Sequence, residues 1–185
     1  MNLWRECALK NLKEKFPALR EWIVIETDRI VFSEDTVKAC ARNACGCYGT
    51  NWSCPPAVGK LSYLEKKIRA YPYVFFFSTC HELEDSFDLE GMDSARQEHT
   101  RLTEEIAEHF SVPHDCVLGA EACNICKQCT YPSAPCRFPE RQRRTVESHG
   151  IDVVVLCERT GLKYCNGQNT VTYFSLLFLE KNVSE

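Results

Sequence analysis

Apolar residues recur about every 3.6 positions in three parts of the chain, a period typical of amphipathic helices. The pattern predicts helices over residues 2–15, 61–71 and 94–110. Pro17 and Pro72 follow the first two of these segments. Each proline is expected to end its helix, because proline lacks the amide hydrogen that a helix interior uses.

Short runs of β-branched, aromatic and aliphatic residues predict strands. Such runs occupy residues 22–27, 29–32, 73–78, 151–156 and 170–179. The last run, TVTYFSLLFL, is too apolar for a strand that faces water on one side. We therefore expect it to be buried on both faces of a sheet.

A further short helix is indicated between Pro139 and Gly150, since proline favours the first helical turn and glycine the position just past the end. Strands that alternate with helices favour an α/β fold. We expect a single domain over residues 1–185, with a mixed β-sheet flanked by helices. Two cysteine-rich segments, residues 39–60 and 119–138, lie between the expected elements and are interpreted as loops that bind metal clusters.

Composition narrows the class of protein. The chain has 185 residues, of which 44% are hydrophobic, so it can form a real core. Its formal net charge of −4 argues against general nucleic-acid binding, which needs a basic surface. No apolar run is long enough to cross a membrane, and the first residues mix charges where an export signal would be apolar. We expect a cytoplasmic protein that binds neither nucleic acid nor membrane.

Thirteen cysteines are unusual for such a chain. A small secreted protein would use them in disulfides, but the expected compartment is reducing and the count is odd. Clustered thiols in a reducing compartment more often bind metal. The cysteines form two groups that differ in how specific their spacing is.

The more specific group has the spacing C-x2-C-x2-C-x6-C, and its members are Cys123, Cys126, Cys129 and Cys136. Three thiolates at this pitch resemble those that hold a cubane cluster in bacterial ferredoxins. A zinc ribbon would usually show two separated C-x2-C pairs. We interpret the group as an iron–sulfur site for a [4Fe–4S] cluster, with zinc as the alternative.

The less specific group has the spacing C-x4-C-x-C-x6-C, and its members are Cys40, Cys45, Cys47 and Cys54. This spacing fits no common zinc pattern. Four ligands would close a second cluster and suit electron transfer, whereas three would leave one iron open to a small molecule. We expect Cys47 to be dispensable, because residues one apart project to opposite sides of an extended chain. Gly46 would nevertheless permit the tight turn that brings both neighbours to one cluster.

Four arginines lie beside the second group of cysteines: Arg137, Arg141, Arg143 and Arg144. A cluster with four thiolates is anionic, so nearby guanidinium groups would favour its reduced form. We therefore assign Arg137 and Arg141 to the binding of the cluster. The patch would also suit an acidic protein redox partner, and the alternative is a solvated helix face.

The sequence also resembles a known family. The runs YGTNWSCPP, CRFPE and ESHGIDV, together with the C-x2-C-x2-C motif, are similar to domain-of-unknown-function family 2284, whose members are described as predicted metal-binding proteins. The resemblance extends from about Cys40 to the C-terminus. It implies that Cys40, Cys45 and Cys54 are ligands, whereas Cys47 has no clear match. The family description implies metal binding and names no reaction.

Three functions remain open after these steps. The favoured one is an electron carrier or the reducing component for a partner enzyme. The second is an enzyme that uses an open cluster iron in small-molecule or sulfur chemistry, and the third is a zinc-stabilised interaction module. No G-x-G-x-x-G, P-loop or C-x3-C-x2-C motif is present, which argues against many nucleotide-dependent and radical enzymes.

Overall fold

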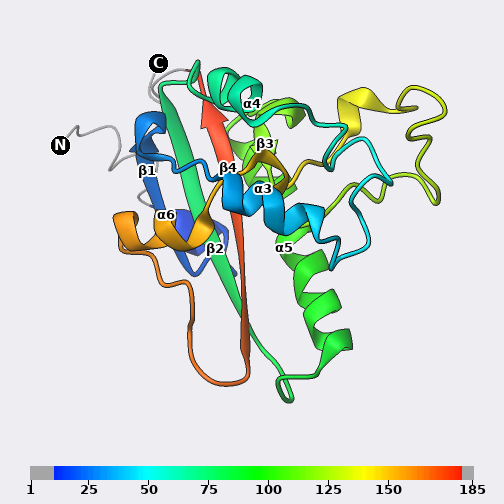
Figure 1. The fold of residues 1–185 in the computed structure, drawn as a ribbon. Coiled ribbons are helices and arrows are strands. Elements are labelled where there is room, and N and C mark those ends of the chain that lie inside the picture. The colour runs from blue at the N-terminus through cyan, green and yellow to red at the C-terminus, as the bar shows by residue number, and fades with distance from the viewer. Residues whose placement is uncertain (1–10, 181–185) are drawn as a thin grey trace.

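A four-stranded sheet forms the centre of the computed structural model, which describes residues 11–180 (Figure 1). The strands lie in the order β1-β2-β4-β3 and pair antiparallel. Their bounds are β1 Glu21–Glu26, β2 Tyr73–Glu82, β3 Val117–Leu118 and β4 Thr170–Leu179. The α/β class with helices on a single sheet is confirmed, although antiparallel pairing replaces the expected mixed arrangement. An isolated parallel bridge joins Gly119 to Thr145 outside the named strands.

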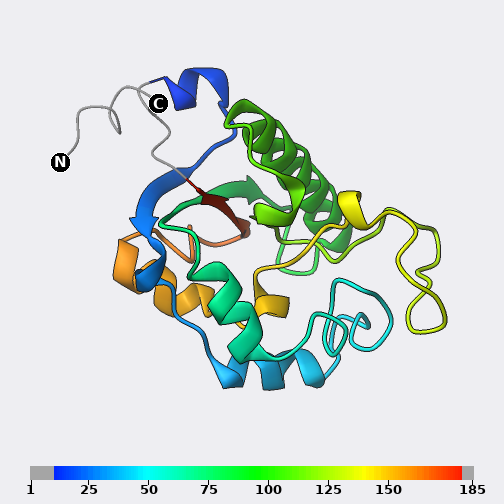
Figure 2. The same cartoon turned by 90° about the horizontal axis from the view of Figure 1, so that it is seen from above.

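The two long central strands, β2 and β4, are buried on both faces, as their apolar sequences predict. Side chains alternate along a strand, so Phe75 and Phe77 enter one core whereas Phe76 enters the other. The first of these cores includes Leu102 and Ile106 of a long helix, α5. The sheet is therefore the middle of three layers, with α5 on one side (Figure 2).

Within residues 11–180, five helices accompany the sheet: α2 Leu12–Lys15, α3 Glu34–Ala41, α4 Leu61–Ile68, α5 Leu89–His109 and α6 Val153–Thr160. The expected helices at residues 61–71 and 94–110 are confirmed as α4 and α5. Helix α5 begins earlier than expected because the Asp88 carboxylate caps it, accepting a hydrogen bond from the Gly91 amide at 2.8 Å. Most of the helix expected at residues 2–15 lies outside the described residues, which contain only its end, α2.

Two expected strands are not present. Residues 153–156 of the first run begin helix α6 instead, because Asp152 caps its first turn and accepts a hydrogen bond from the Val155 amide at 3.0 Å. The run is apolar enough for a buried strand or a buried helix. The helix is favoured because it buries Val153 and Leu156 on one face. The prediction of a strand at residues 29–32 is also wrong. A 3-10 turn ends at Arg29, and Phe32 makes one isolated bridge.

The helix expected between Pro139 and Gly150 is reduced to two 3-10 turns, Pro139–Arg141 and Glu147–His149. Gly150 still ends the second turn in the left-handed conformation, with φ +69°. Between the turns, Thr145 bridges to Gly119 beside β3, and this pairing is incompatible with a continuous helix.

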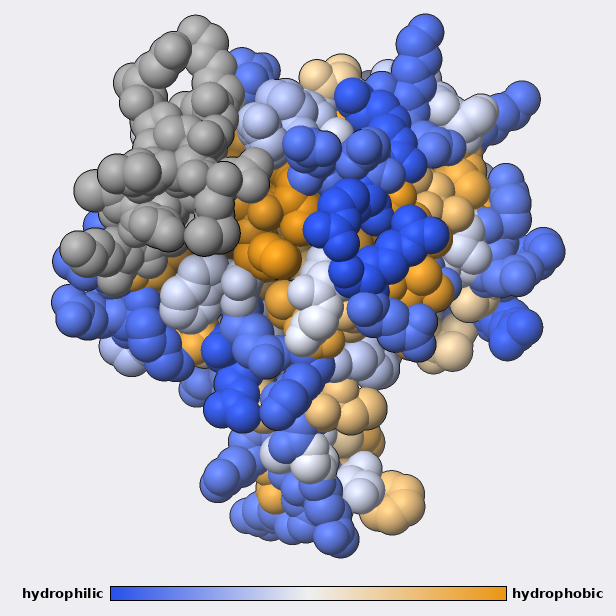
Figure 3. Space-filling view, turned by 90° about the vertical axis from the view of Figure 1, so that its left-hand side faces the viewer, coloured by the Kyte–Doolittle hydropathy of each residue, from blue (hydrophilic) through white to orange (hydrophobic). Residues whose placement is uncertain are grey.

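The two cysteine-rich segments lie side by side at one end of the molecule, beyond α3 and α5 (Figures 1 and 2). Helix α3 occupies the start of the first segment, which was expected to be loop from residue 39. Figure 3 shows the face away from these segments, where hydrophilic side chains surround exposed apolar patches and a lobe projects at the lower end. In the part of the chain from residue 11 to residue 180, no helix has the length and apolar character needed to cross a membrane.

Candidate metal centre

Direct contacts hold the two cysteine segments together. The backbone amide of Cys123 donates a hydrogen bond to Ser53 Oγ at 3.0 Å, and the Trp52 indole donates to the Ala134 carbonyl at 3.1 Å. Trp52 also packs edge-on against the ring of Tyr131, with centroids 4.9 Å apart. Segments about 70 residues apart in the chain thus form one structural unit.

A cavity of about 710 Å³ opens beside the first segment. All four cysteines of the first group line it: Cys40, Cys45, Cys47 and Cys54. Helix α3 positions Cys40 near its C-terminal end, and the loop that follows supplies the other three. The fold therefore gathers this group on one cavity wall.

Cys45 and Cys47 reach the same cavity because the chain between them is not extended. Gly46 has a φ of +74°, a left-handed conformation that glycine adopts without steric cost. The Cys47 thiol lies 3.6 Å from the Cys45 carbonyl oxygen and donates to it. Cys45 and Cys47 therefore do not project to opposite sides, as they would in an extended chain. That extended geometry was the reason for expecting Cys47 to be dispensable.

A buried polar turn positions the last cysteine of the group. Asn51 Oδ1 accepts hydrogen bonds from the Ser53 amide at 2.9 Å and from the Ser53 hydroxyl at 2.7 Å. This side-chain turn fixes the backbone immediately before Cys54. Cys54 is consequently buried, whereas Cys45 is exposed.

The protein environment favours the protonated thiol at three cysteines of this group, Cys40, Cys47 and Cys54. Burial raises the pKa of Cys40, and burial with the nearby Cys45 raises the pKa of Cys47 to about 11. Burial also raises the pKa of Cys54. A bound metal would have to displace these protons, because thiolates are the form that ligates.

The second group surrounds a much smaller cavity, of about 20 Å³. Its lining includes the whole group: Cys123, Cys126, Cys129 and Cys136. Trp52 and Phe138 contribute apolar walls. This site is therefore narrower than the first and is enclosed in part by aromatic side chains.

One cysteine belongs to both cavities. Cys123 lines the narrow cavity with its own group and also lines the large one beside Cys54. Burial is the main cause that raises the pKa of Cys54, and the neighbouring Cys123 adds to that rise. The two cysteine groups are therefore neighbours in space.

Comparison with protein families bears on what these thiols do. Residues 23–179 match the family model DUF2284, described as "Predicted metal-binding protein". The chain belongs to this family. The match confirms the resemblance seen in the sequence, and metal binding is what the family description supplies. Neither the curated proteins nor the solved structures contain a match to the chain.

The donor set of this DUF2284 protein suits a sulfur-ligated metal. Both cavities present several thiols, and no histidine lines either one. Thiolates of this kind bind iron–sulfur clusters or zinc. Within residues 11–180, no three or more Cys, His, Asp or Glu side chains are arranged to hold a single metal ion. The thiols are distributed around cavity walls instead.

The four arginines beside the second group of cysteines do not form a single patch. Arg137 lines the narrow cavity, and its guanidinium donates to the Gln128 carbonyl at 2.8 Å. Arg141 lies above the Phe138 ring, 5.8 Å from its centroid, and faces an adjoining cavity. Arg143 pairs with Glu104 at 2.8 Å. The two arginines assigned to a cluster thus occupy different cavities.

The cysteines outside the two groups have ordinary positions. Cys116 and Cys157 are buried core residues, Cys80 is half-buried on β2, and Cys165 is exposed. Each of the twelve cysteines within residues 11–180 is a free thiol, and Cys7 lies outside those residues.

Sequence reasoning missed two charged residues at the large cavity. Arg96 of α5 and Glu121 both line it and form an ion pair with each other. Glu121 is 7% exposed, and the ion pair offsets part of the cost of burying its carboxylate. Nothing in the local sequence pairs the two residues, because they are 25 positions apart and meet only through the fold.

Proposed function

We propose that this DUF2284 protein binds two iron–sulfur clusters of the [4Fe–4S] type, one at each cysteine group, and transfers electrons to a partner enzyme. The observation that carries the proposal is the position of Cys123 on the walls of both cavities. Two redox centres that share a wall are close enough to exchange electrons through the protein. A partner that docks near the exposed second segment would then receive them.

Iron–sulfur clusters fit the donor set better than zinc does. A structural zinc ion needs four ligands that converge on one point, and the described residues contain no such convergence. A cluster spreads its four ligands over four irons, so thiols distributed around the large cavity suit it. The narrow cavity, of about 20 Å³, would have to widen to admit one. The C-x2-C-x2-C spacing of the second group supports the same choice.

The surrounding residues would tune the clusters. Trp52 and Phe138 exclude water from the narrow cavity, and a drier site shifts the potential of a cluster. Arg137 supplies positive charge at the same cavity, which favours the reduced form. Free thiols also require a reducing compartment, consistent with a cytoplasmic location.

Metal analysis of protein purified without oxygen tests the proposal. Each [4Fe–4S] cluster holds four irons and four sulfides, so we expect about eight of each per chain. The protein should also absorb light through thiolate-to-iron charge transfer. Zinc without labile sulfide would overturn it and favour an interaction module. Iron and sulfide at half this level would reduce the proposal to one cluster.

A second function, an enzyme with an open cluster iron, is favoured by one specific observation. The cavity at the first group measures about 710 Å³, against about 20 Å³ at the second. This space exceeds what cluster ligation needs and falls within the range of small-molecule sites. A substrate could therefore bind beside the first cluster.

The Cys47→Ala variant distinguishes the two proposed functions, an electron carrier and an enzyme with an open cluster iron. If Cys47 is not a ligand, the variant keeps its iron, and cyanide changes the electron paramagnetic resonance of one reduced cluster in both proteins. Loss of one whole cluster would instead identify Cys47 as the fourth ligand and favour electron transfer. Cys165→Ser is the matched control, because Cys165 is exposed and belongs to neither group.

A further inference from the structure

The loop that joins β2 to α5 presents two apolar side chains to water at its tip. Phe87 is 87% exposed and Leu89 is 75% exposed, more than any other large hydrophobic residue within residues 11–180. Figure 1 shows this loop beyond the lower end of the sheet, the end that carries the lobe in Figure 3. Neighbouring exposed apolar side chains with a polar rim mark interaction sites on protein surfaces.

Hydrogen bonds within the loop hold the tip in this arrangement. Asp85 Oδ1 accepts a hydrogen bond from the Phe87 amide at 2.7 Å. The Asp88 carboxylate accepts hydrogen bonds from two backbone amides, that of Glu84 at 3.2 Å and that of Gly91 at 2.8 Å. The backbone that presents Phe87 is therefore fixed before any partner binds, and this lowers the entropy cost of binding.

The tip also concentrates negative charge. Positions 82, 84, 85, 88, 90 and 93 are acidic, and residues 70–95 contain no lysine or arginine. Four of these acidic side chains are exposed and form no ion pair within residues 11–180: Glu82, Glu84, Asp85 and Glu90. The two apolar side chains thus lie within an acidic rim that the described chain does not neutralise.

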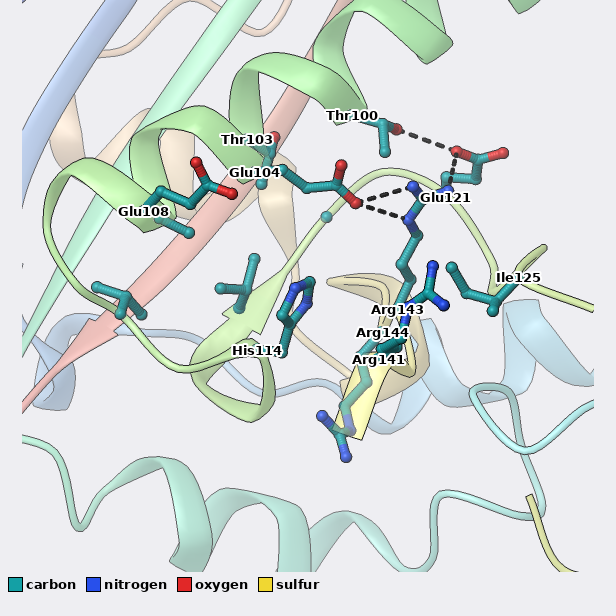
Figure 4. Close-up of a pocket in the computed structure, with 14 residues that line it drawn as sticks. Thr100, Thr103, Glu104, Glu108, His114, Glu121, Ile125, Arg141, Arg143 and Arg144 are labelled. Atoms are coloured by element: carbon teal, nitrogen blue, oxygen red, sulfur yellow. Dashed lines mark hydrogen bonds and ion pairs between the residues drawn. The ribbon is translucent and has the colours of Figure 1, made fainter. Parts of the chain in front are cut away.

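Carboxylates near the second cysteine segment are in a different situation. Figure 4 shows a cavity of about 250 Å³ beside α5, where Glu104 Oε1 accepts hydrogen bonds from Arg143 at 3.0 and 2.8 Å. Glu121 lines the same cavity and pairs with Arg96. The tip has no such cation of its own, so its negative charge is left for a partner to neutralise.

We propose that this tip docks into a partner protein whose surface has an apolar groove rimmed by lysine and arginine. Phe87 and Leu89 fill the groove, and Glu84 and Asp85 face its rim. Protein interfaces commonly have an apolar centre enriched in aromatic side chains and a polar rim. Opposite charges on the two rims speed the encounter and set the orientation of the partner.

The acidic rim argues against other occupants of the tip. It would repel the phosphates of nucleic acids and of anionic lipids. A second copy of this chain carries the same formal net charge of −4, which opposes its association. A basic protein is the occupant whose charge complements the tip.

The tip and the cysteine segments lie apart. Figure 1 shows the tip below the sheet and the cysteine segments at the right-hand side of the molecule. A partner held at the tip therefore leaves the cysteine segments uncovered. The proposal does not depend on which metal those segments bind.

Photocrosslinking in the cells that produce the protein identifies the partner. The full chain carries p-benzoylphenylalanine in place of Phe87, and a control chain carries it in place of Tyr63, which is 64% exposed on α4. We expect position 87 to capture a protein that position 63 does not, and mass spectrometry names it. Capture of a second copy of the chain, of lipid or of nothing specific to position 87 overturns the proposal.

Calorimetric titration of the purified whole chain with that captured protein, also purified, tests the chemistry of the contact. Phe87→Ala should weaken binding at least about tenfold, because truncating a central anchor has the largest effect on an interface. Glu84→Lys should weaken binding too and reduce its dependence on salt, since salt screens exposed charges. Tyr63→Ala should bind as the wild type does. Wild-type affinity in Phe87→Ala, equal weakening in Tyr63→Ala, or wild-type binding that salt does not weaken would refute the assignment.

Discussion

Ser53 Oγ accepts a hydrogen bond from the backbone amide of Cys123, and this 3.0 Å contact joins the two cysteine segments. Ser53 is 0% exposed, and its hydroxyl in turn donates to Asn51 Oδ1. A buried turn of the first segment thus sets the position of the first ligand candidate of the second segment. The two cysteine groups are expected to respond together when this contact is removed.

Replacing Ser53 with alanine tests that coupling. The substitution leaves the Cys123 amide without its partner, and an unsatisfied buried group costs about 1–3 kcal/mol. We expect the free energy of unfolding to fall by that amount and the metal content of both groups to fall with it. Urea denaturation and metal analysis measure the two effects.

Thr50→Ala is the matched control for Ser53→Ala. Thr50 is exposed, and its hydroxyl donates to the Cys47 carbonyl at 2.9 Å within the same segment. It therefore contributes nothing to the junction between segments. Equal losses in the two variants would show that the Ser53 contact has no special role.

Cys126→Ser separates the second group from the first. Cys126 lines only the narrow cavity, whereas Cys123 lines both. We expect the variant to lose about half of the iron and sulfide of a two-cluster chain, since each cubane holds equal numbers of both. Anaerobic metal and sulfide assays give the ratio. Retention of the full content, or loss of all of it, would contradict two separable sites.

Gly150→Ala is expected to destabilise the fold strongly. Gly150 has a φ of +69°, and a methyl group there would overlap Leu61 Cδ1 and approach Val37 Cγ2 to 3.2 Å. The left-handed backbone costs about 1 kcal/mol for a non-glycine residue, and the crowding adds about 1–3 kcal/mol. The junction of α3, α4 and the turn before α6 would have to move apart.

Gly161→Ala measures the backbone cost alone. Gly161 has a similar φ of +81°, and no atom lies within 4 Å of the methyl position. Thermal denaturation of both variants should show the larger loss at Gly150. Equal losses of stability in the two variants would mean that the Leu61 and Val37 side chains move to accommodate the methyl group at no energetic cost.

His99 makes stability depend on pH. It is 0% exposed and hydrogen-bonds Thr79 Oγ1 and Ser175 Oγ, each at 2.8 Å. Burial lowers the pKa of His99 to about 3, whereas an unfolded histidine titrates near 6.5. Between these values the unfolded chain takes up a proton that the folded protein does not. The free energy of unfolding should therefore fall below about pH 6.5, by up to about 1.4 kcal/mol per pH unit.

His99→Asn should show a shallower pH dependence together with lower stability at pH 7, where two hydrogen bonds are lost. Urea denaturation from pH 7 to pH 4.5 gives both quantities. His114→Asn is the control, because His114 is exposed at the rim of the cavity in Figure 4. An unchanged slope in His99→Asn would assign the acid sensitivity to other groups, of which buried His149 is the first candidate, since burial lowers its pKa to about 4.

Local sequence patterns predicted the elements whose conformation depends mainly on residues that are neighbours along the chain. The apolar runs of β2 and β4 predicted strands buried on both faces, and the helical spacing of Leu102 and Ile106 predicted α5. Each of these elements has a single apolar period and the length to sustain it. Residues 151–156 lacked such a period, so the cap at Asp152 and burial against the sheet made them a helix.

The sequence by itself determined which thiols belong together, because ligand spacing is a property of a short segment. Only the tertiary structure placed Cys123 on both cavities, turned Cys47 toward its group through Gly46, and separated Arg141 from Arg137. It also brought Arg96 to Glu121 and left Arg144 without a partner among the described residues. These relationships join positions that are distant in the chain or depend on backbone conformation. They arise only when the sheet and α5 pack and bring the loops into contact, so no period or spacing in the sequence encodes them locally.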